Sequence, residues 1–372
     1  MPTFEPPKRL LMGPGPSNVS PRVLTAMSKP TIGHLDPRFV ELMDEIKELL
    51  QYAFQTKNKV TFPVSGPGSA GMELCLINLI EPGDKVVVCI NGVFGGRMKQ
   101  VVERCGGTAI AIEQDWGKAI DPEKLEETLK LNPDVDLVAF VHAETSTGAK
   151  SDIKTLTQIA HSHNCLVVAD TVTSLGGIKL KIDEWEIDVS YSGTQKCLSC
   201  PPGLSPVTFN QKAIDKIKNR NTPVQSWFMD INLITGYWGH GTKRTYHHTA
   251  PINSLYGLHE ALLMLKEEGL ENAWERHQKN SELLCRGVEE LGLNIFVEED
   301  ERLPELVTVT VPIGIDEAKI RSYLLNEHNL EIGAGLGALA GKIWRIGLMG
   351  FTSNKENVKT FLSAFNDAIN SN

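Results

Sequence analysis

Short apolar runs alternate with stretches of helical periodicity over the first two thirds of the chain. The apolar runs predict strands at residues 60–64, 85–90, 108–112, 136–142, 165–169 and 207–209. The helical periodicity predicts a helix from the SGPGS segment to residue 79, and others at 94–105 and 153–163. Strands separated by helices require crossover connections, so we expect a mostly parallel sheet covered by helices on both faces.

The pattern changes beyond residue 250. Helices are predicted at 254–266, 271–291, 316–326 and 355–369, with strands at 307–311 and 343–346. We therefore expect an α/β fold in three parts. These are an extended N-terminal arm (residues 1–20), a large domain built on the sheet (21–255), and a linking helix with a smaller α+β C-terminal domain (256–372).

Composition and charge narrow the class of protein. Hydrophobic residues make up 41% and charged residues 22% of the 372 residues, a balance typical of soluble globular proteins. The net charge of −9 argues against a surface for nucleic acid or anionic lipid. No apolar run is long enough to cross a membrane, and neither end resembles a targeting signal. We therefore expect a cytoplasmic enzyme.

Seven cysteines stand in the chain, several of them within apolar segments. An odd number in such positions fits reduced core residues better than a disulfide framework. Cys197 and Cys200 form a CxxC pair, but a structural zinc site needs a second pair, and the histidines show no ligand spacing. We therefore expect no metal site.

A glycine-rich segment, Ser65–Ser69 (SGPGS), joins the first predicted strand to a helix. Glycines let backbone amides approach an anion, and the start of a helix adds partial positive charge. The segment is therefore a candidate phosphate cradle. A tight turn between strand and helix would have a similar sequence.

An aspartate and a lysine supply the candidate chemistry. Asp170 ends the apolar run CLVVAD, at the edge of a parallel sheet where ligands collect, and Lys196 follows in YSGTQK. A lysine in small, polar surroundings can have a lowered pKa and form a Schiff base. This order indicates pyridoxal phosphate, in which the acid keeps the ring nitrogen protonated and the lysine carries the aldehyde. A structural Asp–Lys ion pair would give the same spacing.

Six motifs then point to one family. GPGPSN, HAETSTG, ADTVTSLGG, SGTQK, YHHT and WRIGLMG follow one another from about Leu11 to the last helix. In this order they resemble the class V pyridoxal-phosphate aminotransferases, and within that family the alanine–glyoxylate (serine–pyruvate) branch. The resemblance implies the fold-type I architecture and a homodimer with shared active sites. It also implies transfer of the amino group of L-alanine, or L-serine, to glyoxylate, giving pyruvate and glycine by a ping-pong mechanism.

The resemblance also implies roles for individual residues. Lys196 and Asp170 are catalytic, and Arg345 and Gly15 bind the substrate, with Arg345 holding its α-carboxylate. The other residues matched to the cofactor are Gly68, Ser69, Phe94, Thr145, Val172, Gln195, Tyr246 and Thr249. The last two lie in YHHT and are expected to reach the phosphate of the neighbouring subunit.

Two positions depart from the family, and several reactions stay open. Phe94 stands where many relatives carry Trp, and Ser69 where some carry His, which affects the fine detail of cofactor binding. Serine–glyoxylate, 3-hydroxykynurenine and 2-aminoethylphosphonate transamination remain alternatives. A cysteine desulfurase is disfavoured because the late cysteine, Cys285, lies in a helical stretch. A binding protein without activity would be expected to have lost Lys196 or Asp170.

Overall fold

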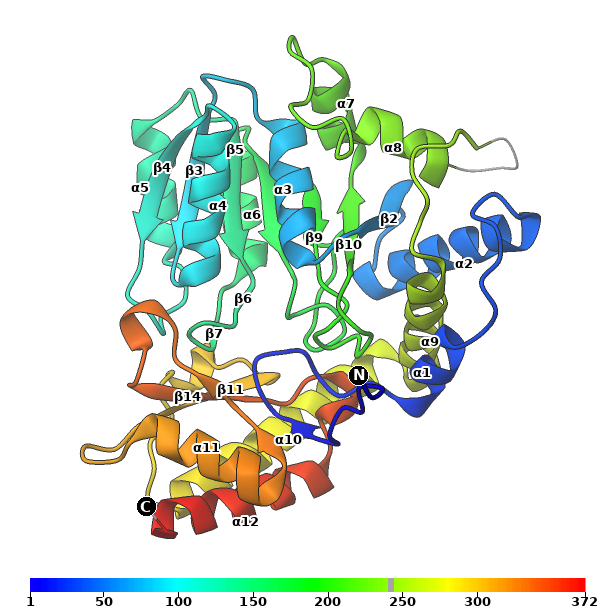
Figure 1. Ribbon diagram of the computed structural model, residues 1–372. Coiled ribbons are helices and arrows are strands. Elements are labelled where there is room, and N and C mark those ends of the chain that lie inside the picture. Colours follow the sequence, from blue (N-terminus) through cyan, green and yellow to red (C-terminus); the bar gives the residue numbers. More distant parts are fainter. Residues whose placement is uncertain (240–243, 372) are drawn as a thin grey trace.

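The computed structural model describes residues 1–239 and 244–371. Its largest sheet has seven strands in the order β2-β10-β9-β8-β5-β3-β4 (Figure 1). Their bounds are β2 (Val60–Ser65), β10 (Leu204–Phe209), β9 (Val189–Tyr191), β8 (Leu166–Asp170), β5 (Leu137–Val141), β3 (Lys85–Ile90) and β4 (Thr108–Glu113). The pairs from β9 to β4 are parallel, and β10 is antiparallel to both of its neighbours. The predicted α/β fold with a mainly parallel sheet is confirmed.

Helices cover both faces of this sheet. On one face α3 (Gly68–Leu79) and α4 (Val93–Arg104) contact each other, and on the other α5 (Pro122–Leu131) contacts α6 (Ile153–Ser162) (Figure 1). With both faces covered, every residue of β5 is buried, which explains its continuous apolar sequence, LVAFV. The predicted strand at 136–142 corresponds to β5.

Some helices were absent from the predicted elements, α2 (Pro37–Phe54) above all. It begins after Asp36, whose carboxylate accepts a hydrogen bond from the Arg38 N–H (2.8 Å). One face of α2 is buried through residues at helical spacing: Phe39, Met43, Ile46 and Leu50. The prediction also lacked four other helices: α5, described above, α1 (Pro21–Met27), α7 (Gln211–Lys218) and α8 (Ile231–Trp238).

The C-terminal part has its own sheet and core. Its strands are β11 (Leu306–Thr310), β14 (Ile343–Gly347) and β13 (Gly333–Ala334), in that order. Its helices are α10 (Leu270–Glu290), α11 (Glu317–His328) and α12 (Lys355–Ser371), and α9 (Ile252–Glu268) precedes them and packs on α1 and α2. The core of this part includes Trp344, Phe361 and Phe365. The small sheet lies against the carboxyl ends of the large sheet's strands (Figure 1).

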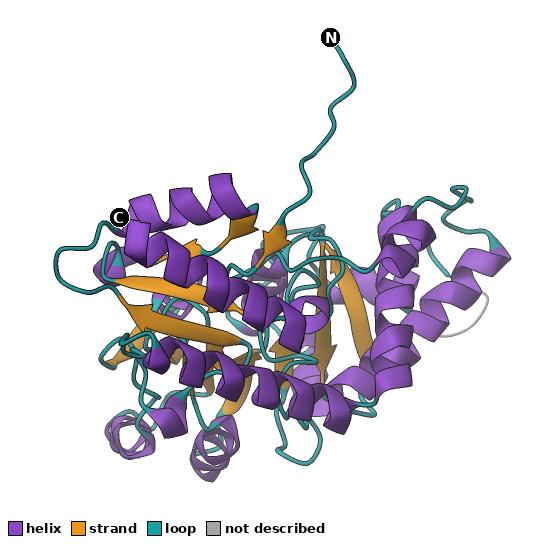
Figure 2. Ribbon diagram, turned by 90° about the horizontal axis from the view of Figure 1, so that it is seen from below, coloured by secondary structure: helices purple, strands orange, loops and turns teal. Residues whose placement is uncertain are grey.

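The N-terminal segment joins this C-terminal part. Residues 1–8 are exposed and lead away from the body (Figure 2). Strand β1 (Leu10–Leu11) then pairs in parallel with β12 (Leu330–Glu331), and Met12 is buried in the C-terminal core. The predicted division into an arm (residues 1–20) and two domains (21–255 and 256–372) stays a prediction, because nothing in the fold fixes those boundaries.

The remaining elements are short. A hairpin of β6 (Ala143–Glu144) and β7 (Ala149–Lys150) follows β5, and 3₁₀ turns occur at Glu299–Glu301, Gly337–Leu339 and Gly350–Thr352. Among the described residues, no helix combines the length and apolar character needed to cross a membrane.

The C-terminal core should depend strongly on its aromatic side chains. Phe361 is fully buried and stacks on Phe365, with ring centroids 4.9 Å apart. We expect Phe361→Ala to lower the free energy of unfolding by about 3–5 kcal/mol in urea titrations, since it leaves a cavity. Leu131→Ala is the control, because Leu131 is 81% exposed and should change stability by less than about 0.5 kcal/mol. Equal effects of the two variants would contradict this account of the core.

Candidate active site

Asp170 lies at the carboxyl edge of the large sheet, where β8 ends. It is buried, and its carboxylate accepts hydrogen bonds from the Val172 N–H (2.8 Å) and the Tyr191 hydroxyl (2.7 Å). Tyr191 is the last residue of β9 and is the register partner of Asp170, which explains why the two side chains meet. Burial raises the pKa of Asp170 to about 7, although both hydrogen bonds favour the ionised form. A cationic group beside this carboxyl would stabilise its charge.

Lys196 lies in the loop that follows β9. Its amine donates a hydrogen bond to the Pro14 carbonyl. Burial lowers the pKa of Lys196 to about 8, and the positive charge of Arg345 acts in the same direction. The opposite charges of Lys196 and Asp170 each favour the ionised form of the other, so the two groups lie within electrostatic reach. The fold therefore brings the predicted catalytic pair together.

The N-terminal segment closes over Lys196. Ser17 donates from its N–H to the Gln195 carbonyl (2.9 Å) and from its hydroxyl to the Lys196 carbonyl (2.8 Å). Gly15 has a φ of +98°, and a Cβ built there would lie 2.7 Å from Lys196 Cδ. Only glycine permits this backbone conformation together with so close an approach. The predicted substrate residue Gly15 thus lies directly against the lysine.

Arg345 approaches the same region from β14 of the small sheet. Its Nε donates to the Ala334 carbonyl (2.6 Å) and its NH1 to the Thr145 carbonyl (3.1 Å). Burial lowers the pKa of Arg345 to about 10, and the carboxylate of Glu144 acts against this shift. These contacts fix the guanidinium plane at the junction of the two sheets, next to the buried Thr145.

The SGPGS segment lies beside Asp170. Helix α3 begins at Gly68, and its N-cap residue, Pro67, provides no side-chain acceptor for the first amides. A Cβ built on Gly68 would lie 3.2 Å from Val172 Cγ2, so the cradle adjoins the residue expected under the ring. Nearby, the buried Gln195 Oε1 has no hydrogen-bond partner among the described residues.

Phe94 and Ser69 are joined by an arginine that was not predicted. Arg97 donates to the Ser69 hydroxyl (3.2 Å), and its guanidinium carbon lies 5.1 Å from the centroid of the Phe94 ring. The Phe94 N–H donates to Glu144 Oε2 (3.1 Å). Glu144 is fully buried, and this burial raises the pKa of its carboxyl. These contacts place Phe94 and Ser69 on the same side of the site.

Three polar residues of this site were missing from the prediction. Glu144 stands in HAETSTG directly before Thr145, the only residue of this motif that the resemblance matched to the cofactor. Tyr191 opens YSGTQK, but its contact with Asp170 depends on strand register, which the sequence pattern does not give. Arg97 stands three residues after Phe94, a helical spacing that brings the two side chains to one face of α4.

Tyr246 and Thr249 are not brought to the pocket within one chain. Tyr246 is 62% exposed and contacts the ring of His34, with centroids 5.2 Å apart, and Thr249 is also exposed. Their segment is held to the end of β2 by a hydrogen bond between His248 Nε2 and the Ser65 hydroxyl (2.8 Å). Their expected contact with a neighbouring subunit stays a prediction.

These features fit the group expected from the motifs. Pyridoxal phosphate needs an anion cradle, an acid for its ring nitrogen and an amine for its aldehyde. The start of α3 provides uncapped amides, Asp170 is a buried carboxyl with a raised pKa, and Lys196 is a buried amine with a lowered pKa. The unpartnered Gln195 oxygen is a further buried polar atom, which can accept a hydrogen bond from a donor of a bound group.

Comparison with known proteins identifies the family. The family model described as Aminotransferase class-V matches residues 10–361. The chain belongs to the class V aminotransferases. This class depends in general on pyridoxal phosphate, so the predicted family and the predicted enzyme class are confirmed.

Individual relatives of this class V aminotransferase cover nearly its whole length. An alanine–glyoxylate aminotransferase of Rattus norvegicus is 42% identical over 365 residues, which are 98% of this chain and 88% of the relative. An (S)-ureidoglycine–glyoxylate transaminase of Bacillus subtilis (strain 168) is 39% identical over 371 residues, 95% of this chain and 88% of the relative. A solved structure of an alanine–glyoxylate aminotransferase from Nostoc sp. has a TM-score of 0.97 at 47% identity and covers 99% of this chain and 97% of its own.

The arrangement of the cysteines and of possible metal ligands is also visible in this aminotransferase. All seven cysteines are buried and free, as expected for reduced core residues. The Cys197 thiol donates to the Thr173 carbonyl (3.2 Å). Within residues 1–239 and 244–371, no group of three His, Cys, Asp or Glu side chains is arranged to hold a metal ion.

The raised pKa of Asp170 predicts a pH-dependent stability. The pKa is about 7 in the folded state and 3.8 in the unfolded chain, so the folded state holds more protons between these values. The contribution of Asp170 is therefore complete below pH 4 and is lost as the pH rises through 7. Asp170→Asn removes this loss while keeping the shape of the side chain.

We expect the stability of Asp170→Asn, relative to the wild type, to rise by roughly 2–4 kcal/mol between pH 4.5 and pH 8. The measurement is urea unfolding of both cofactor-free proteins at several pH values. A difference that stays constant with pH would show that Asp170 is ionised throughout this range.

Proposed function

We propose that this aminotransferase uses pyridoxal phosphate, bound between Lys196 and Asp170, to move the amino group of L-alanine or L-serine to glyoxylate. With alanine the products are pyruvate and glycine. The observation that carries the proposal is the meeting of a buried amine and a buried carboxyl, with Arg345 beside the amine. The alanine–glyoxylate aminotransferases of Rattus norvegicus and Nostoc sp., which both match nearly the whole chain, support the substrates.

Each candidate residue has a part in holding the cofactor. The amides at the start of α3, with Gly68 and Ser69, would bind the phosphate, and Gln195 would donate to it from its side-chain N–H. Phe94 would stack on one face of the ring and Val172 would pack on the other. Thr145 would contact the ring edge.

The catalytic steps depend on proton positions. When bound, the cofactor withdraws electrons from the substrate Cα and so lowers the cost of removing the α-proton. Asp170 keeps the proton on the ring nitrogen, because its carboxylate is held by Val172 and Tyr191 and gains a cationic partner there. Lys196 Nζ moves the α-proton, since its lowered pKa leaves part of the amine neutral near pH 7–8. Two such half-reactions, one with the amino donor and one with the keto acid, make a ping-pong cycle.

Arg345 would bind the α-carboxylate of both substrates. A planar guanidinium can hold a carboxylate through two parallel hydrogen bonds, and the contacts with Ala334 and Thr145 fix its plane. Gly15 would border the same substrate from the opposite side, because its backbone lies against the lysine.

A second amino donor is supported by one relative. The Bacillus subtilis protein is named for (S)-ureidoglycine and glyoxylate, and it is 39% identical to this chain over the 371 aligned residues. Glyoxylate thus occurs in the names of relatives with different donors, which favours glyoxylate as the acceptor. Ureidoglycine is therefore a second candidate donor. Serine–glyoxylate, 3-hydroxykynurenine and 2-aminoethylphosphonate transamination are further candidate reactions.

The function is tested by the absorbance of the loaded protein. We expect L-alanine to bleach the visible absorbance of the bound cofactor and glyoxylate to restore it. Lys196→Ala should lose this absorbance and at least about 10²-fold in turnover, because the amine holds the cofactor and moves the proton. Lys179→Ala, at an exposed lysine, is the control. Turnover and visible absorbance that survive Lys196→Ala would defeat the mechanism, and a panel of amino donors would decide between the candidates.

A shared active site would explain the exposed positions of Tyr246 and Thr249. In a homodimer these residues would reach the phosphate bound by the neighbouring subunit. Mixed dimers of Lys196→Ala and a Tyr246→Ala/Thr249→Ala double variant should therefore recover activity, because one of their two sites keeps all its residues. Each parent variant alone is the control. If mixing restores nothing, although native mass spectrometry finds mixed dimers, the two residues serve their own subunit.

A further inference from the structure

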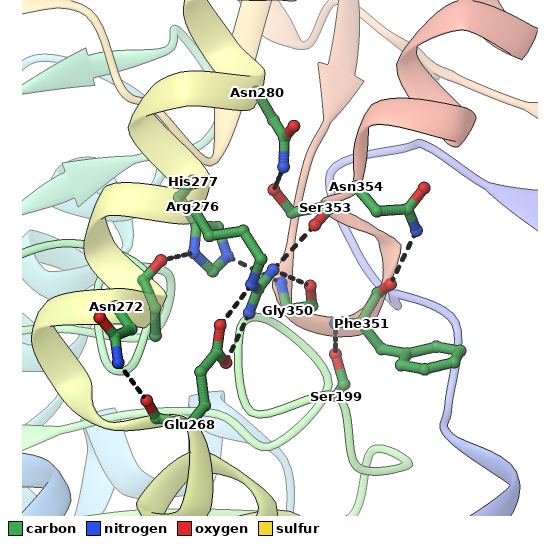
Figure 3. Close-up of polar contacts among 11 residues, drawn as sticks. Ser199, Glu268, Asn272, Arg276, His277, Asn280, Gly350, Phe351, Ser353 and Asn354 are labelled. Carbon is green, nitrogen blue, oxygen red and sulfur yellow. Dashed lines mark hydrogen bonds and ion pairs between the residues drawn. The ribbon is translucent and has the colours of Figure 1, made fainter.

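Arg276, on α10, connects three segments near the boundary of the two cores (Figure 3). Its Nε and NH2 form a two-point ion pair with the carboxylate of Glu268, at 2.5 and 2.9 Å. Its NH1 donates to the carbonyls of Gly350 and Ser353, both at 2.8 Å. The arginine therefore holds the 3₁₀ turn at Gly350–Thr352, which we call the 350 turn, to the end of α9 and to α10.

His277 holds the same turn from the next position on α10. Its Nδ1 donates to the Ala273 carbonyl (2.6 Å), and its Nε2 accepts a hydrogen bond from the Gly350 N–H (2.9 Å). Burial lowers the pKa of His277 to about 4, so the ring is neutral at neutral pH and can serve as this acceptor. Asn280 adds a contact with the Ser353 hydroxyl (3.2 Å). The 350 turn is thus fixed along one face of α10 (Figure 3).

Ser199 joins the 350 turn to the loop of Lys196. Its hydroxyl accepts a hydrogen bond from the Phe351 N–H (2.8 Å) and contacts the Ser17 hydroxyl (3.1 Å). Ser17 in turn donates to the Lys196 carbonyl. Gly350 has a φ of +52°, and a Cβ there would overlap the Ser199 hydroxyl and the Cys197 carbonyl. The two loops are therefore in direct backbone contact, which only glycine permits at this position.

The 350 turn is also close in sequence to the substrate arginine. Strand β14 carries Arg345 and ends at Gly347, three residues before Gly350. On the other side of the contact, Ser199 is three residues from Lys196. One hydrogen-bonded turn thus connects the segment that carries the amine with the strand that carries the guanidinium.

We propose that Arg276 and Ser199 are positioning residues that set the separation of Lys196 from Arg345 through the 350 turn. This inference rests on the proposed function, in which the amine serves the cofactor and the guanidinium binds the substrate carboxylate. Neither residue has a described contact with Asp170 or the start of α3. Their effect therefore falls on the alignment of substrate with lysine, and the cofactor contacts at Asp170 and at the start of α3 are left intact. Misplacing reacting groups by about 1 Å can lower the rate on the order of 10²-fold.

The test compares two arginines that pair with neighbouring glutamates of α9. Arg276→Gln removes the tie to the 350 turn, whereas Arg22→Gln removes ion pairs with Glu260 and Glu267 that do not reach this turn. Ser199→Ala is a second, smaller change that deletes one hydrogen-bond acceptor. It keeps the proposal testable if Arg276→Gln destabilises the fold. The full-length proteins, as purified, are compared by hydrogen exchange, by thermal unfolding and by kinetics with L-alanine and glyoxylate.

We expect Arg276→Gln and Ser199→Ala each to speed amide exchange in residues 195–200 and 345–353 together. We also expect each to lower kcat/KM for L-alanine about tenfold, with visible cofactor absorbance unchanged. The double variant should show less than the sum of the two effects, because both act on one turn. Arg22→Gln should change only the melting temperature.

Two results would overturn the proposal. One is exchange that rises at residues 345–353 while residues 195–200 stay protected as in the wild type. The other is that Arg276→Gln and Arg22→Gln lose kcat/KM in the same proportion to their loss of melting temperature. A wild-type protein without transaminase activity would defeat the proposed function instead, and the exchange of residues 195–200 would still decide whether the two loops are coupled.

Discussion

Burial of opposite charges at one sheet edge is the constraint on which the site depends. Removing a carboxyl and an amine from water penalises the charged form of each, so the pKa of Asp170 rises and that of Lys196 falls. The surrounding fold offsets this cost for the acid with two hydrogen bonds, one from the backbone of Val172 and one from Tyr191. The chain thus maintains two groups near the point of changing protonation at neutral pH, as acid–base chemistry requires.

The second requirement is that two other backbone segments approach the loop of Lys196 closely. Glycine permits this approach at Gly15 and at Gly350. Gly15 lets the N-terminal segment lie against the side chain of Lys196, and Gly350 lets the 350 turn reach Ser199 and Cys197. Lys196 is therefore enclosed by segments from the beginning and the end of the chain. The large sheet provides its acid partner, and the small sheet provides the arginine nearby.

The sequence predicted those parts of the fold whose signals are local. Strands β3, β5 and β8 are continuous apolar runs because both faces of the sheet are covered, and Asp170 was noticed because it ends such a run. Helix α2 was missed, although its buried residues follow helical spacing and Asp36 caps it. The two-residue strands β12 and β13 were missed because so short a segment has no periodicity to read.

The residues of the site also divide into those that a local motif predicted and those that it did not. Family motifs carried Lys196, Arg345 and Gly15 to positions that the fold brings together. The contacts of Tyr191 with Asp170 and of Glu144 with Phe94 depend on strand register and burial. Both are set by residues far away in the sequence, so no local pattern identified Tyr191 or Glu144. Tyr246 and Thr249 lie on the surface of the single chain, and their roles depend on contacts outside it.

The pairing of β1 with β12 affects how this protein is made. Leu10 is synthesised about 320 residues before its partner, Leu330, and leaves the ribosome long before it. The large sheet can form while synthesis continues, but β1 cannot dock until β12 has emerged, and closing so long a loop carries an entropic cost. Gly15 therefore reaches Lys196 only after Leu330 and Glu331 have emerged, so a nascent chain that stops before them would hold an open, inactive pocket.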